Sequence, residues 1–204
     1  MATDAVTLIM NDHRLFERIF EMLQSGDGDR RKLLNECAAR LTAHSHAEEM
    51  KVYPALAQAD PSESDEVHHG ADEHHQAEMM LLKLQRLDPR SQEFENALNE
   101  FINAVKHHIE EEETEILPSM RETLDQQTLE QLGAEFERIR REELQVAGIT
   151  GDEIMSTSTM SGGSSGDEMS KAELYAEAKK ADIAGRSQMT KEELAEALRS
   201  KNGS

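Results

Sequence analysis

The chain has 204 residues, enough for one domain of about 150 residues with a small addition. Its composition is 37% hydrophobic and only 3% aromatic, with no tryptophan, which favours a helical bundle over a β-sandwich. The formal net charge of −20 at pH 7 argues against nucleic acid or an anionic membrane as a partner of the main domain, and it favours cations.

Nothing in the sequence predicts export. The single cysteine, Cys37, cannot form an internal disulfide. The first residues, MATDAVTLIMNDH, contain acid where a signal peptide has cations, and their apolar run is short. No segment approaches the roughly 18 apolar residues that cross a bilayer. We therefore expect a cytoplasmic protein with no membrane partner.

Apolar residues recur at helical spacing through most of residues 1–145, which predicts a series of amphipathic helices. The pattern is interrupted at the SGDGD run, at the DPSESDE loop and before proline, which disfavours a helical conformation in the preceding residue. Four helices are predicted in this way, over residues 6–24, 34–54, 74–88 and 94–118. A fifth stretch, TLEQLGAEFERIRREEL, is predicted to pack along the outside. The expected fold class is all-α, an up-down-up-down four-helix bundle with an outer helix and a small C-terminal helical unit.

The composition changes after residue 145. Residues 146–169 are dominated by Ser, Thr, Gly and Met, which indicates a flexible linker. Residues 170–204 contain two short helical patterns around a turn, with a nearly even balance of charge. The predicted organisation is therefore a bundle at 1–145, a linker at 146–169 and a small helical unit at 170–204.

Four histidines lie inside the apolar stripes, one on each predicted helix, and a glutamate follows one turn later on the second and fourth helices. These six residues are His13, His44, Glu48, His74, His108 and Glu112. The segments HSHAEEMKVYP and HIEEEETEILP share His, Glu-Glu and Pro at identical spacing, which indicates an internal duplication of a helix pair. The distances from the interhelical loops place the four histidines at one level of the bundle.

A single histidine on the inward face of a helix is more often a core residue with hydrogen-bonded ring nitrogens than a metal ligand. The two inward glutamates change this reading, because an isolated buried carboxylate costs several kcal/mol unless it is paired or binds a metal. No Lys or Arg lies on the stripes beside Glu48 or Glu112. We therefore predict a pair of divalent cations. Imidazole and carboxylate without thiolate favour iron or manganese over structural zinc, and six ligands leave positions open for water, dioxygen, peroxide or nitric oxide.

The pattern His, HxxxEE, His, HxxxEE resembles the hemerythrin-like HHE cation-binding family over roughly residues 5–145. The resemblance implies an up-down four-helix bundle that holds two iron ions joined by an oxo or hydroxo bridge. It further implies that the four histidines are terminal ligands and that Glu48 and Glu112 bridge the two ions.

The sequence departs from the oxygen-carrying hemerythrins, which have HxxxH on the third helix and HxxxxD on the fourth. No histidine of the third helix has another four residues later, and Glu78 stands one turn after His74. His68, His69 and Glu78 remain open as additional ligands. The departure disfavours reversible oxygen carriage and favours peroxide or nitric oxide chemistry. Tyr53 is interpreted as an aromatic residue at the edge of the bundle.

Three functions fit such a centre. The first is a protein that binds dioxygen, peroxide or nitric oxide in sensing or a stress response. The second is a catalase-like enzyme that decomposes peroxide, in which the metals supply the chemistry, because no separate acid–base residue stands out. The third is iron storage or sequestration. A stable adduct, rapid turnover of peroxide, or more than two irons per chain would distinguish these functions.

The segment ELYAEAKKADIAGRSQMTKEELAEAL resembles the small helical unit at the N-terminus of transcription terminator Rho. Such units are sometimes associated with nucleic acid, so this resemblance leaves nucleic acid open as a partner of the C-terminal unit. The nearly even charge favours a protein-docking or spacer role, since affinity for phosphate depends on Lys and Arg.

Overall fold

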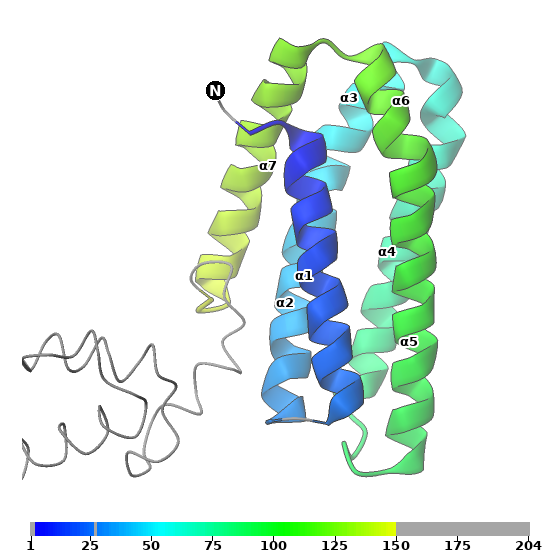
Figure 1. Ribbon diagram of the computed structural model, residues 1–204, viewed down its shortest axis with the longest axis vertical. Coiled ribbons are helices and arrows are strands. Elements are labelled where there is room, and N and C mark those ends of the chain that lie inside the picture. The colour runs from blue at the N-terminus through cyan, green and yellow to red at the C-terminus, as the bar shows by residue number, and fades with distance from the viewer. Residues whose placement is uncertain (1–2, 27, 150–204) are drawn as a thin grey trace, which may run out of the picture. The chain divides into compact units, whose positions relative to one another are not determined.

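The computed structural model describes residues 3–26 and 28–149, and this part of the chain is entirely helical. Figure 1 shows four long helices that run side by side and a fifth that covers one side of them. The four are α1 (Ala5–Ser25), α2 (Arg30–Ala47), α4 (Ser64–Leu84) and α5 (Gln92–Glu111), and the fifth is α7 (Gln126–Val146). The predicted all-α class, with a four-helix bundle and an outer helix, is confirmed.

Polar side chains fix the points at which the helices begin. Asp4 accepts a hydrogen bond from the backbone N–H of Thr7, and Ser91 accepts one from that of Phe94, so each satisfies a donor that its helix leaves free. At the other end of α1, Gly26 adopts a left-handed conformation with φ of 74°, which favours glycine. The SGDGD run therefore ends the first helix as predicted.

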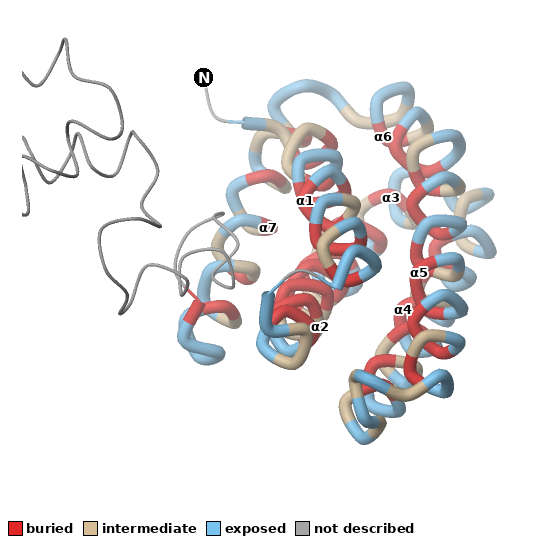
Figure 2. The backbone as a smooth tube through the Cα atoms, turned by 60° about the horizontal axis from the view of Figure 1, so that its bottom comes forward, coloured by how far each residue is buried: buried red, intermediate tan, exposed pale blue. Residues whose placement is uncertain are grey.

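Two apolar clusters fill the bundle, and the polar residues of interest lie between them. One cluster occupies the end of the bundle where α1 joins α2 and α4 approaches α5, and it includes the crossed rings of Phe20 and Phe101. The other gathers the first turns of α1 with residues of α7 and of the two short helices α3 (Tyr53–Ala59) and α6 (Leu117–Thr123). Figure 2 shows the buried residues on the inward faces of the long helices. Cys37 is fully buried in the first cluster, as its place on the apolar stripe predicted.

The second helix does not end at Pro54. A π-helical segment, Glu48–Val52, continues α2 and leads into α3 (Tyr53–Ala59), in which Pro54 lies on the first turn. The backbone N–H of Tyr53 donates to the carbonyl of Glu48, five residues earlier, which is the wide hydrogen bond of a π turn. Proline is tolerated there because the first turn of a helix needs no N–H donor from it.

The same arrangement recurs in the other half of the chain. The π-helical segment Glu112–Ile116 joins α5 to α6 (Leu117–Thr123), and Pro118 again lies on the first turn. The predicted helix ends at the two prolines were therefore wrong for one reason. Proline interrupts the hydrogen bonds of a regular α-helix. When the turn before the proline is a wider π turn, however, the chain continues as a helix beyond it.

The third long helix begins ten residues earlier than its apolar pattern predicted. A single 3₁₀ turn, Pro61–Glu63, leads directly into α4 at Ser64. The first turns of α4 are rich in acids and histidines, so only Val67 and Gly70 face the core there, too few to show helical periodicity. The early start places His68 and His69 on the helix.

Helix α7 lies outside the four-helix core, as predicted, but it does more than cover the surface. Phe136 is fully buried, and its ring meets His44 edge-on at 5.6 Å between centroids. A side chain at Gly133 would overlap the carbonyl oxygen of Thr3, so this glycine permits α7 to cross the start of α1 closely. The fifth helix therefore closes the bundle on the side of α1 and α2.

The described part of the chain continues a few residues beyond α7. Ile149 is buried and packs with Ala43 and Leu144. The rest of the predicted linker and the whole predicted unit at 170–204 lie outside the described residues. Among the helices of residues 3–149, none has both the length and the apolar character needed to cross a bilayer.

Candidate metal centre

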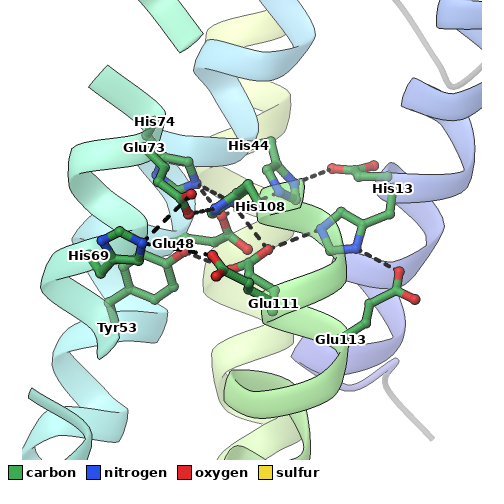
Figure 3. Close-up of polar contacts among 12 residues, drawn as sticks. His13, His44, Glu48, Tyr53, His69, Glu73, His74, His108, Glu111 and Glu113 are labelled. Carbon is green, nitrogen blue, oxygen red and sulfur yellow. Dashed lines mark hydrogen bonds and ion pairs between the residues drawn. The ribbon is translucent and has the colours of Figure 1, made fainter. Parts of the chain in front are cut away.

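The six predicted ligands come together in one buried layer of the bundle (Figure 3). Each of the four long core helices supplies one histidine, and each π-helical segment begins at one of the two glutamates. None of the six is more than 5% exposed: His13, His44, Glu48, His74, His108 and Glu112. The stripes therefore identified both the inward direction and the common level of these side chains.

The ligand atoms form two groups that share Glu48. We call the group of His13, His44, Glu48 and Glu112 the first position, and the group of Glu48, His74 and His108 the second position. Within each group the ligand atoms all lie within 4.8 Å of one another, and the residues are buried. Each group could hold one cation.

Each glutamate oxygen that faces the centre lies between a histidine of the first position and one of the second. Glu48 Oε2 is 3.3 Å from His44 Nε2 and 3.3 Å from His74 Nε2. Glu112 Oε2 is 3.1 Å from His13 Nε2 and 3.5 Å from His108 Nε2. This is the arrangement that two bridging carboxylates would require.

The buried polar atoms of this layer fit a pair of cations. Within the described chain, His13 Nε2, both carboxylate oxygens of Glu48 and Glu112 Oε2 have no hydrogen-bond partner. Burial, together with the nearby charge of Glu112, raises the pKa of Glu48 well above its usual value. Two carboxylates buried this way are costly without positive charge between them, and two divalent ions would supply it.

The other ring nitrogen of every histidine contacts a carboxylate. The Nδ1 atoms of His13, His44, His74 and His108 lie 2.9, 3.3, 2.9 and 2.9 Å from Glu113, Asp12, Glu49 and Glu73 respectively. Such carboxylates fix the tautomer and orient Nε2 inward, as is common for histidines that bind metals. The hydrogen bond from His74 lowers the pKa of Glu49, and the one from His108 lowers the pKa of Glu73.

These four carboxylates were missed by the stripe argument, although the sequence contained a signal for them. Asp12 and Glu73 directly precede the first histidine of each half, while Glu49 and Glu113 are the second acids of the two Glu-Glu pairs. The duplicated segments therefore supply the outer carboxylates as well as the inner ligands. Asp12 is itself held by Arg140 from α7.

Tyr53 lies within the centre, so its interpretation as an edge aromatic was wrong. Its side chain is 4% exposed, stacks on His74 with an interplanar angle of 7°, and donates a 2.6 Å hydrogen bond to Glu112 Oε1. Gly70, one turn before His74, makes room for it, because a Cβ there would lie 2.8 Å from the tyrosine oxygen. Burial raises the pKa of Tyr53 well above its usual value, so the hydroxyl remains a donor.

None of the residues left open as extra ligands belongs to either position. His68 is exposed and bonds the backbone carbonyl of Ser64. Glu78 lies beside Thr42, at 3.5 Å. His69 is 58% exposed and belongs to a separate group with Glu73 and Glu111.

The two positions have different surroundings. Beside the first position, the rings of Phe16 and Phe136 meet His44 edge-on at 5.3 and 5.6 Å. Beside the second, a cavity of about 180 Å³ is lined by His74 and His108. The rest of its wall is largely apolar and includes Leu41, Ala77, Ala104 and Val105. A small molecule could therefore reach the second position through this cavity.

Comparison with known proteins agrees with the fold and the type of site. A family model described as the Hemerythrin HHE cation binding domain matches residues 4–120. A crystal structure of a hemerythrin HHE cation binding domain-containing protein from Mycobacterium kansasii is similar, with a TM-score of 0.60 and 23% identity. The match covers 76% of this chain and 99% of that one. No curated protein matches the chain. The resemblance of the C-terminal segment to the Rho unit has no support from these comparisons.

Proposed function

Because this chain belongs to the hemerythrin HHE cation-binding domain family, we propose that it is a non-haem di-iron protein that interacts with dioxygen, peroxide or nitric oxide. The first and second positions would each hold one ion, with Glu48 and Glu112 between them. Manganese is the alternative metal. We assign the protein to sensing or a stress response rather than to oxygen carriage.

The observation that best supports a two-iron centre is that the two positions have matching donors, with two histidines in each and glutamate between them. Imidazole and carboxylate donors without sulfur suit iron and manganese. An outer carboxylate on every histidine makes the ring a stronger ligand. When bound, iron would supply redox chemistry and open coordination positions, and the side chains would hold its geometry.

The second position is the one at which we expect a small molecule to bind. The cavity lies against His74 and His108, the two histidines of this position. A cavity of about 180 Å³ with largely apolar walls suits dioxygen, nitric oxide or peroxide. Tyr53 stacks on His74 and directs its hydroxyl to Glu112, which fixes the orientation of both residues.

A peroxide-decomposing enzyme is the second candidate. It is favoured by Tyr53, whose hydroxyl is a protonated donor held at the centre. Iron storage is less well supported, because the buried layer offers ligands for a pair of ions.

Anaerobic reconstitution of the full chain with Fe(II), followed by metal analysis and spectroscopy, tests the proposal. We expect two irons per chain, and one or none in His74→Ala. His75→Ala is the matched control, because this neighbouring histidine is exposed. A stable nitric oxide adduct with negligible oxygen evolution from peroxide would support a sensor, and rapid evolution would support the enzyme. A chain that retains no stoichiometric metal would overturn both.

A further inference from the structure

A third group of metal-binding side chains lies at the surface between α4 and α5. His69 and Glu73 are four residues apart on α4, and Glu111 faces them from the end of α5 (Figure 3). His69 Nε2 lies 3.8 Å from Glu73 Oε1 and 3.8 Å from Glu111 Oε2. One ligand atom from each of the three lies within 4.8 Å of the others. The spacing of His69 and Glu73 repeats the His-xxx-Glu pattern of the two buried pairs.

This group adjoins the buried centre. The two oxygens of Glu73 face in opposite directions, with Oε1 toward His69 and Oε2 2.9 Å from His108 Nδ1. A small surface hollow is lined by the three residues of the group and also by His108 and Glu112. The hollow therefore joins the exposed group to two ligands of the centre.

One carboxylate oxygen of the group is buried and lacks a hydrogen-bond partner within the described chain. It is the Oε2 atom of Glu111, which lies 3.8 Å from His69 Nε2. The wall of the hollow also includes Glu66 and Glu115, and it contains no Lys or Arg. An oxygen-rich wall without fixed cations attracts a metal ion from solution.

We propose that His69, Glu73 and Glu111 form a third cation site, which takes a divalent transition-metal ion and delivers it to the second position. One imidazole and two carboxylates are donors that suit Fe(II) or Mn(II). The site is half-exposed and offers three side chains, so it binds the ion loosely and releases it. The delivery role depends on the proposed di-iron function, but the binding of a cation here does not.

The binding step can be tested with Mn(II) alone, followed by electron paramagnetic resonance at low ionic strength. In the full chain with Glu48→Gln, the shared ligand of the buried centre is removed, and we expect one loosely bound Mn(II) to remain. Adding His69→Ala and Glu111→Gln should weaken this binding at least about tenfold, since the loss of one good donor commonly costs that much. Equal Mn(II) binding with and without these two substitutions would overturn the site.

The matched control is His68→Ala with Glu110→Gln. Both residues are exposed direct neighbours of the proposed ligands and do not belong to the group. This control should bind Mn(II) as the Glu48→Gln chain does. Circular dichroism of each variant separates a lost site from a lost fold.

The delivery step is measured by the rate at which the metal-free chain takes up Fe(II). The variant His69→Ala, Glu111→Gln should reach the same final iron content as the unaltered chain, but roughly tenfold more slowly at low salt. An unchanged rate would refute delivery. If the unaltered chain and its Glu48→Gln variant instead bind the same single ion, the proposed centre fails while the third site stands.

Discussion

The two halves of the proposed centre differ in what surrounds them. The first position is closed: α7 packs against α1 and α2, Phe16 and Phe136 cover His44, and Arg140 holds the outer carboxylate Asp12. The second position has no such cover on its cavity side, where His74 and His108 face about 180 Å³ of space. The proposed third site adjoins this cavity, because the cavity and the hollow of the third site are both lined by Glu73 and His108.

The difference comes from positions at which the two duplicated halves of the chain are not alike. Tyr53 and Gly70, which lie beside the second position, correspond to Leu117 and Ile9 in the duplicated pattern. Within residues 3–149, no helix covers α4 and α5 as α7 covers α1 and α2. The residues that the two halves share are the ligands and their outer carboxylates. The comparison therefore suggests that the repeated residues hold the metals and that the unrepeated ones decide which metal meets small molecules.

Removing the residue that the two positions share should have the largest effect. Glu48→Gln should abolish binding at both positions, because its carboxylate belongs to both groups. The metal-free variant should nevertheless be more stable than the metal-free parent at neutral pH, by about 1 to 3 kcal/mol, since a buried carboxyl group without a hydrogen-bond partner is replaced by a neutral amide. Metal analysis and denaturant unfolding measure the two effects.

The stability difference should depend on pH in a definite direction. The folded pKa of Glu48 is raised above its usual value of 4.5. Its contribution to stability is therefore fully present below that value and is lost as pH rises through the folded pKa. The advantage of Glu48→Gln in the metal-free state should vanish in acid and grow toward neutral pH. Glu78→Gln is the control, and an equal effect there would contradict the assignment.

Filling the cavity beside His74 and His108 should affect only the second position. Ala104→Leu places a larger side chain among the residues that line it. The larger side chain narrows the cavity, and each increase of about 1.4 kcal/mol in the entry barrier should slow the binding of nitric oxide roughly tenfold. The iron content should remain two per chain. Stopped-flow absorption measures the rate, with Asn103→Leu, an exposed neighbour, as the control. An unchanged rate would mean that small molecules enter elsewhere.

Changing the tyrosine should have the smallest of these effects. Tyr53→Phe keeps the ring that stacks on His74 but removes the hydrogen bond to Glu112. The affinity for the second metal should fall by about tenfold, the lower end of what loss of an outer partner causes. Competition with a chelator measures this. A visible absorption band that disappears in the variant would instead indicate direct ligation by the tyrosine.

The sequence predicted the centre better than its surroundings, for a physical reason. The six candidate ligands interrupt apolar stripes, and a polar residue at a core position is visible without knowledge of the fold. Tyr53 has an apolar ring and a polar hydroxyl, and it precedes a proline. The spacing of apolar residues therefore could not show whether its hydroxyl is buried in the centre or its ring lies at the edge of the bundle. The outer carboxylates come from neighbouring helices, and their partners depend on helix rotation about the bundle.

The backbone changes at Pro54 and Pro118 could not be predicted from local propensity. A π turn adds one residue without changing the type of residue present, so the apolar pattern alone does not reveal it. Asp12 and Glu73 each directly precede an inward histidine in the sequence, but the pairing of Asp12 with His44 required the structure. The predicted linker and C-terminal unit remain predictions.

The π-helical segments that begin at Glu48 and Glu112 bear on how the chain evolved. Both halves contain a π-helical segment at the same place, followed by a proline at the same spacing. A feature shared in this way is most simply inherited from one ancestral helical hairpin, whose gene was then duplicated and fused. Two such hairpins related by a two-fold axis would already have placed every repeated ligand around the axis. The present chain would then correspond to two fused copies of the hairpin, with α7 added later over the side formed by α1 and α2.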